Sequence, residues 1–147
     1  MPKAVIFDLD GTLIDSTEAI VGSMWHVFDT IGEPRPTRQA IIDSIGCPLR
    51  EQLQILTRHD VDECIGIYRP HYTETARAKT FLLEGARELL AWLREQGLPV
   101  GLATSKKREA AEMLLEYLGV LDHFAVRIGP DEVTHPKPHP EPLLMAA

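Results

Sequence analysis

Residues 5–12 read Val5-Ile6-Phe7-Asp8-Leu9-Asp10-Gly11-Thr12, and the fold prediction starts from them. Its start continues a short apolar run from Ala4 whose length and β-branched content predict a strand buried on both faces. Two carboxylates, Asp8 and Asp10, follow at positions i and i+2, and Gly11-Thr12 predicts a turn. The stretch therefore predicts a buried strand with two acidic side chains just past its carboxyl end.

The next segment, residues 15–80, has the apolar spacing of helices almost throughout. Asp60 and Glu63 have the spacing of a capping box, which opens the last of these helices. Pro70 is expected to kink or divide that helix, because proline lacks the N–H that a helix interior needs. Other predicted helix ends lie at Asp15 or Ser16, Gly32, Thr37, Gly46 and Pro48.

After about residue 80, helices and short apolar strands alternate. The pattern predicts helices over residues 84–97 and 106–118, and strands over 99–103 and 124–128. Strands that alternate with helices imply right-handed crossovers and a parallel sheet. The predicted fold class is therefore α/β, with a helical insertion directly after the first strand.

Three polar clusters follow the three predicted strands. They are Asp8 with Asp10, then Thr104-Ser105-Lys106-Lys107-Arg108, and finally Lys137 in Lys137-Pro138-His139-Pro140. Ligands of parallel sheets bind at the carboxyl ends of the strands, so this coincidence indicates one shared site.

Each cluster also has an ordinary structural interpretation. Asp8 and Asp10 would repel one another unless a cation such as Mg²⁺ lies between them, but an Asp-Gly turn is equally typical after a strand. Residues 104–108, between a strand and a helix start, would bind an anion, or would be a capped helix with exposed cations such as Lys106 and Lys107. Lys137 would be aimed by its neighbouring prolines, or would be a solvated loop lysine.

Together the clusters form a working set for phosphoryl transfer, which needs an in-line nucleophile, a proton donor and positive charge around the phosphoryl oxygens. Asp8 is the candidate nucleophile and would form an aspartyl-phosphate. Asp10 is the candidate general acid and base. Thr104 and Lys137 are expected to bind the phosphoryl oxygens.

Histidine and cysteine offer weaker signals. His135 and His139 suggest a metal pair, but a proline-rich loop without two further ligands favours ordinary loop histidines. Cys47 and Cys64 have no motif-like spacing and are expected to be unrelated reduced thiols.

Composition excludes several classes of function. The net charge of −7 argues against a nucleic-acid partner. No apolar run approaches the roughly 20 residues that cross a bilayer, and the first residues lack a signal-peptide pattern. We expect a soluble cytoplasmic enzyme that acts on a small anionic substrate, without a nucleic-acid or membrane partner; the sequence does not indicate its oligomeric state.

Residues 5–16, with Thr104 and the 137–140 tract, resemble the motifs of the haloacid dehalogenase-like superfamily. The resemblance implies a Rossmann-like core, residues 1–14 and 81–147, with a helical cap over 15–80. It implies Mg²⁺ held by Asp8 and Asp10, and the roles given above for Asp8, Asp10, Thr104 and Lys137. Further phosphate contacts are expected from Gly11, Ser105 and Lys106.

Within this superfamily, Asp10 argues against the true dehalogenases, which have a tyrosine there. Residues 10–16 and the Ile45-Gly46-Cys47-Pro48-Leu49-Arg50 segment are most similar to the phosphoglycolate phosphatase branch, with β-phosphoglucomutases as the alternative. Gly46 and Arg50 are expected to touch the non-phosphate end of a small phosphorylated metabolite.

The superfamily's fourth motif, an acidic strand end that adds Mg²⁺ ligands, has no counterpart after Lys137. The expectation is a fragment of a longer enzyme, with weak or no activity alone and with residues 5–7 as an exposed strand edge. A non-catalytic protein that binds a phosphorylated ligand is the alternative from another class.

Overall fold

The computed structural model describes residues 2–147. Its internal contacts divide the chain into two compact units, Met1–Asp15 with Phe81–Ala147, and Ser16–Thr80. The second unit is thus an insertion into the first. That the two units serve as a catalytic core and a substrate-facing cap remains a prediction.

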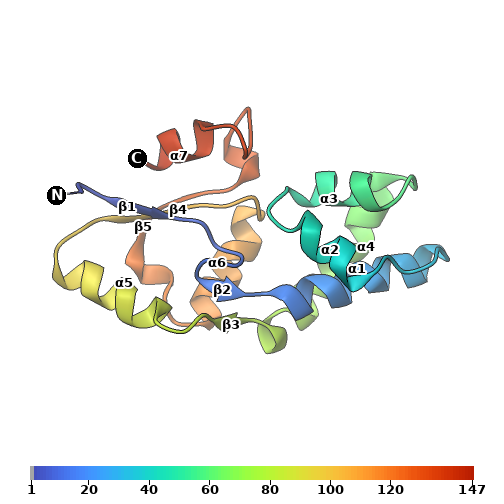
Figure 1. The fold of residues 1–147 in the computed structure, drawn as a ribbon, viewed down its shortest axis with the longest axis horizontal. Coiled ribbons are helices and arrows are strands. Elements are labelled where there is room, and N and C mark those ends of the chain that lie inside the picture. The colour runs from blue at the N-terminus through green and yellow to red at the C-terminus, as the bar shows by residue number, and fades with distance from the viewer. Residues whose placement is uncertain (1) are drawn as a thin grey trace. The chain divides into compact units, whose positions relative to one another are not determined.

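The sheet of the first unit confirms the predicted parallel α/β fold (Figure 1). Its order is β1 (Val5–Phe7), β4 (Val100–Ala103) and β5 (Phe124–Ile128), all parallel. Central β4 is buried throughout, whereas the residues of β1 are half-buried. The expectation that β1 is buried on both faces is therefore wrong, whereas the expectation that residues 5–7 form a strand edge is confirmed by the sheet order.

Helices cover both faces of the sheet. Figure 1 shows α7 (Glu141–Ala146) on one side and α5 (Ala86–Glu95) and α6 (Arg108–Tyr117) on the other. Ala146 of α7 packs with Ala103 and Ile128, which are the last residues of β4 and β5. Short 3-10 turns, η2 (Leu121–His123) and η3 (Pro130–Glu132), flank β5. The core thus holds the carboxyl ends of the strands together.

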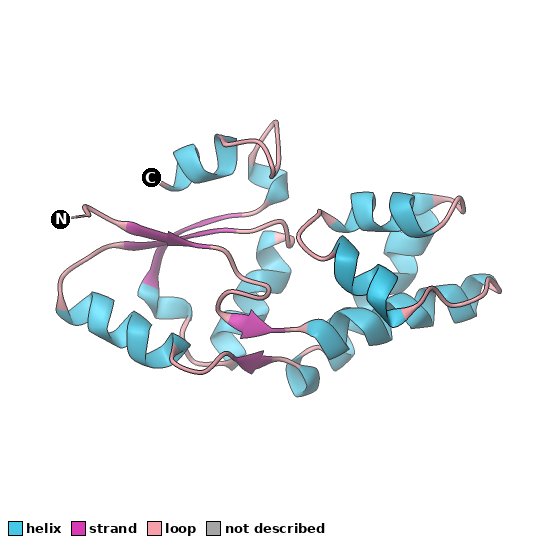
Figure 2. Cartoon of the chain, in the orientation of Figure 1, coloured by secondary structure: helices cyan, strands magenta, loops and turns pink. Residues whose placement is uncertain are grey.

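A second, antiparallel pair of strands was not predicted. The pair consists of β2 (Ile14–Asp15) and β3 (Phe81–Leu82), drawn as short magenta arrows in Figure 2. Two residues are too few to show a strand periodicity in sequence. The chain leaves the first unit after Asp15 and returns to it at Phe81, and the pairing of β2 with β3 holds these two points together.

The inserted unit is helical, as predicted. It consists of α1 (Thr17–Ile31), α2 (Arg38–Ser44), α3 (Leu49–Leu56), α4 (Val61–Thr75) and the 3-10 turn η1 (Arg77–Lys79). Predicted caps are present, since Thr37 Oγ1 accepts from Ala40 N at 3.1 Å and Asp60 Oδ1 accepts from Glu63 N at 2.8 Å. Pro70 does not divide α4, which is one continuous helix.

Two further expectations concern single features. Cys47 and Cys64 are free thiols, as expected. Within residues 2–147, no helix has the length and apolar character needed to cross a membrane.

Candidate active site

Asp8 directly follows β1, and both of its contacts fall on one oxygen. Oδ1 accepts a hydrogen bond from Leu9 N at 2.8 Å and lies 3.0 Å from Lys137 Nζ. The side chain is 41% exposed, so a ligand from solvent reaches the carboxylate. Both contacts thus hold Oδ1, and Oδ2 takes part in neither of them.

Lys137 connects the ends of two strands. Its ammonium contacts Asp8 after β1 and also donates to Ala103 O, at the end of β4, at 2.9 Å. Sequence reasoning missed Ala103, because a backbone carbonyl carries no residue-specific signal. The lysine is a positioned cation at the carboxyl end of the sheet and not a solvated loop residue.

Asp10 forms a second ion pair. Lys106 Nζ lies 3.2 Å from Asp10 Oδ1, and both side chains are largely buried, at 10% and 14% exposure. Because α6 begins at Arg108, Lys106 lies in the loop before the helix and not in its first turn. The predicted helix start was therefore two residues early, and Asp10 is the anion that accounts for this cation.

Two hydroxyls lie between β4 and α6. Thr104 N donates to Ile128 O at 2.9 Å, and Thr104 Oγ1 accepts from Lys106 N at 3.0 Å, which leaves the hydroxyl proton to donate. Ser105 Oγ is buried and has no hydrogen-bond partner within residues 2–147. A buried hydroxyl without a partner costs about 1–3 kcal/mol, which an anionic ligand would recover.

Gly11 shapes the turn after Asp10. Its φ of +79° lies in the left-handed region that favours glycine, and its N–H donates to Ile14 O at 2.8 Å. This N–H is thus bonded within the turn, and the contact expected between Gly11 and phosphate stays a prediction.

The two remaining candidates, Gly46 and Arg50, belong to the inserted unit. Gly46 has a φ of +112°, and Arg50 Nη2 pairs with Asp62 Oδ1 at 2.5 Å. Arg50 therefore has a partner within its own unit. The substrate contacts expected of Gly46 and Arg50 remain predictions.

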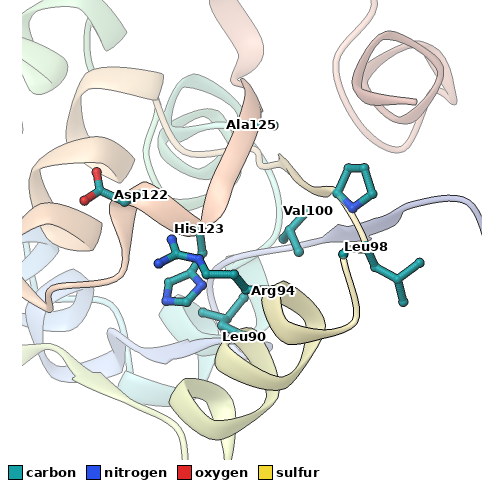
Figure 3. A pocket seen from close by; sticks show the side chains of 9 residues that line it. Leu90, Arg94, Leu98, Val100, Asp122, His123 and Ala125 are labelled. Carbon is teal, nitrogen blue, oxygen red and sulfur yellow. The ribbon is translucent and has the colours of Figure 1, made fainter.

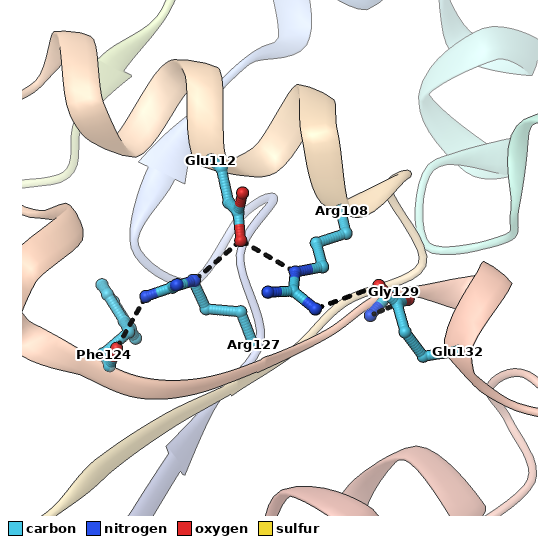
Figure 4. Close-up of polar contacts among 6 residues, drawn as sticks. All are labelled: Arg108, Glu112, Phe124, Arg127, Gly129 and Glu132. Carbon is cyan, nitrogen blue, oxygen red and sulfur yellow. Dashed lines mark hydrogen bonds and ion pairs between the residues drawn. The ribbon is translucent and has the colours of Figure 1, made fainter.

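An ion-pair network fixes the loop that follows β5 (Figure 4). Glu112 Oε1 accepts from both Arg108 Nε and Arg127 Nε at 2.8 Å. Arg108 Nη1 also lies 3.6 Å from Glu132, whose carboxylate accepts from Gly129 N at 3.0 Å. The hydrogen bond from Arg108 lowers the pKa of Glu112, so this carboxylate stays ionised and the network ties α6 to the end of β5.

A cavity of about 260 Å³ in the same unit lies away from these residues (Figure 3). Its walls include Val100 at the start of β4 and Asp122 and His123 just before β5. These residues lie at the amino ends of the strands. The cavity is therefore at the opposite end of the strands from Asp8, which follows the carboxyl end of β1.

The ends of the strands combine accessible oxygens with positive charge. Two carboxylates each face an ammonium, and donor hydroxyls lie in the adjoining loop. This arrangement suits the binding of a phosphoryl group, whose oxygens need cations and donors. Carboxylate and carbonyl oxygens are also the ligand types that Mg²⁺ prefers.

The fold places the molecule among α/β proteins with a Rossmann-like core and a helical insertion. More specifically, the chain belongs to the haloacid dehalogenase-like hydrolase family, whose model matches residues 5–147. Pyrophosphatase PpaX of Halalkalibacterium halodurans is 37% identical over 141 residues, which cover 96% of this chain and 66% of that protein. This chain thus spans just under two thirds of that relative's length.

Solved structures agree with this assignment. Protein Tyrosine Kinase A (PtkA) of Mycobacterium tuberculosis has a TM-score of 0.82 at 35% identity, over 99% of this chain and 68% of that one. A protein described as a predicted phosphoglycolate phosphatase from Haemophilus somnus has a TM-score of 0.90 over 97% of this chain and 69% of that one. Its identity of 22% supports the fold alone.

Proposed function

We propose that this protein is a Mg²⁺-dependent phosphatase of small phosphorylated metabolites that acts through an aspartyl-phosphate on Asp8. One observation carries the proposal: the accessible Asp8 carboxylate is held through Oδ1 by Leu9 N and by Lys137 Nζ at 3.0 Å. A carboxylate fixed by one oxygen presents the other to an incoming phosphorus atom. The family and the PpaX relative support the same reaction class.

The reaction would proceed in two displacements. Asp8 Oδ2 forms a bond to phosphorus as the ester bond breaks, and Asp10 gives a proton to the departing oxygen. Water then attacks the aspartyl-phosphate, Asp10 takes up its proton, and inorganic phosphate leaves with Asp8 restored. Lys137, Thr104 and Ser105 would hold the phosphoryl oxygens through both steps.

The metal site would use hard oxygen ligands. The Asp8 carboxylate and an Asp10 oxygen would hold Mg²⁺, and the backbone carbonyl of Asp10 suits this role because its carboxylate faces Lys106. When bound, the ion supplies positive charge that screens the phosphoryl oxygens from the Asp8 carboxylate.

The test replaces the nucleophile and leaves the fold intact. In a longer form that includes the superfamily's fourth motif, Asp8→Asn should abolish Mg²⁺-dependent phosphate release from phosphoglycolate, pyrophosphate and p-nitrophenyl phosphate. The control is Asp122→Asn, because Asp122 is exposed and lies near the amino ends of the strands. This variant should retain the wild-type rate. Turnover by Asp8→Asn would contradict the mechanism.

Two alternatives give different outcomes in the same assay. A phosphoryl transferase would pass the group from Asp8 to a sugar hydroxyl faster than to water, and the kinase name of the PtkA relative makes this worth measuring. A non-catalytic protein would bind a phosphorylated ligand saturably, and it would release no phosphate from any of the three substrates even in a longer form that includes the fourth motif.

A further inference from the structure

The loop between β5 and α7, together with the first residue of α7, gathers three potential metal ligands outside the site described above. One nitrogen each of His135 and His139 and one carboxylate oxygen of Glu141 lie within 4.8 Å of one another. The two rings have centroids 4.7 Å apart, and His135 Nδ1 lies 3.2 Å from Glu141 Oε2. Glu141 adds a third ligand to the histidine pair, which the sequence alone did not indicate.

Backbone hydrogen bonds hold this cluster in place. The Glu141 carboxylate accepts from Thr134 N and from His135 N, each at 2.8 Å, and these bonds lower the pKa of Glu141. Glu141 N in turn donates to His139 Nδ1 at 3.1 Å. The segment is thus closed on itself, with an ionised carboxylate beside two imidazoles.

From this geometry we propose that His135, His139 and Glu141 form a binding site for a divalent transition-metal ion of the Zn²⁺ type. Two imidazoles and one carboxylate are a common ligand set for such ions, with a fourth position left for water or an anion. Tetrahedral zinc bonds of about 2.0–2.2 Å place ligands roughly 3.3 Å apart, so the three atoms must converge by about 1.5 Å at most. Both histidines are exposed, so their rings turn without displacing packed neighbours.

This site differs in chemistry from the proposed Mg²⁺ site. Mg²⁺ prefers oxygen ligands, whereas imidazole nitrogens suit Zn²⁺, Ni²⁺ and Cu²⁺. The bound ion would lie beside the loop that carries Lys137. His135 precedes that lysine in the chain, and His139 and Glu141 follow it. Binding of Zn²⁺ and binding of phosphate esters are separate measurements, so failure of one leaves the other standing.

The test is titration of the metal-free 147-residue chain with Zn²⁺ by calorimetry, in millimolar Mg²⁺, and with Co²⁺ for its visible absorption. We expect one ion per chain, with Mg²⁺ unable to compete. His135→Ala and His139→Ala should each weaken binding by about tenfold or more. His26→Ala, an exposed histidine of the inserted unit that stacks on His71, is the matched control and should bind as the wild type does.

Several results would overturn the proposal. These are no binding by the wild type, displacement of Zn²⁺ by Mg²⁺, unchanged affinity in both cluster variants, or loss of affinity in His26→Ala. Urea unfolding of each variant shows whether a loss reflects misfolding. Should one histidine variant misfold, Glu141→Gln and the other histidine variant still carry the test, since each removes one ligand.

Discussion

At the scale of single residues, Lys137 has two contacts of different kinds, an ion pair with Asp8 and a hydrogen bond to Ala103 O. Lys137→Met removes both. We expect phosphate release to fall about 10²-fold or more, because one fixed donor to a phosphoryl oxygen is lost. The free energy of unfolding should fall by about 1–3 kcal/mol as the carbonyl loses its donor.

The matched control for this change is Lys107→Met. Lys107 Nζ lies 3.5 Å from Glu109, whose side chain is 83% exposed. A surface pair of this kind contributes about 0–1 kcal/mol, so both phosphate release and urea unfolding should stay close to the wild type. Equal losses in the two lysine variants would mean that Lys137 has no special position.

Asp10 gives a second prediction at this scale, which separates proton transfer from nucleophilic attack. Asp10→Asn should slow hydrolysis of alkyl phosphates such as phosphoglycolate by about 10²–10⁴-fold, because their leaving oxygen needs a proton. The loss should be smaller for p-nitrophenyl phosphate, whose leaving group departs unprotonated. An equal loss of kcat on both substrates would contradict the role of Asp10 as the acid.

At the scale of elements, the contact between the end of β5 and the start of α6 leaves no room for a side chain. A Cβ on Gly129 would lie 2.8 Å from Arg108 N, a backbone atom. Gly129→Ala should therefore lower the free energy of unfolding by about 1–3 kcal/mol through overpacking. Urea unfolding measures the difference.

Gly66 provides the control for this substitution. It lies exposed in α4, and a Cβ there would meet nothing within 4 Å. Gly66→Ala should raise stability by about 0.5–1 kcal/mol, because alanine favours the helix more than glycine does. The opposite signs of the two substitutions distinguish steric conflict from a general effect of replacing glycine.

At the scale of the whole molecule, both units contain a histidine whose pKa burial lowers, His71 in the insertion and His123 before β5. The unfolded chain therefore binds more protons than the folded one between the ordinary histidine pKa, about 6.5, and the lower folded values. The free energy of unfolding is therefore highest above about pH 6.5 as far as these two histidines are concerned, and it decreases as the pH falls from there through their lower folded pKa values.

The measurement is the free energy of unfolding in urea at pH 7.5 and pH 5.5. His71→Asn, which keeps a polar atom near the Nδ1 that bonds Ser23 Oγ at 2.9 Å, should lose less stability between these pH values than the wild type. If the free energy of unfolding of His71→Asn falls between pH 7.5 and pH 5.5 by as much as that of the wild type, His71 does not contribute to the pH dependence.

Local sequence patterns predicted the order of the longer helices and of the parallel strands, and they predicted the neighbourhood of the candidate site. Caps such as Thr37 and Asp60 and the apolar spacing of helices act over a few residues, so they are readable locally. Asp8, Thr104 and Lys137 could be assigned to one site, because the carboxyl ends of parallel strands lie on the same side of the sheet.

The contacts between individual atoms could not be predicted and follow from the tertiary structure. The contacts of Lys137 with Ala103 O and with Asp8 join residues far apart in sequence. Glu141 completes a cluster with His135 and His139 only through the path of the loop that leads into α7. Such contacts depend on register, strand order and loop path, which distant residues set together and no local pattern encodes.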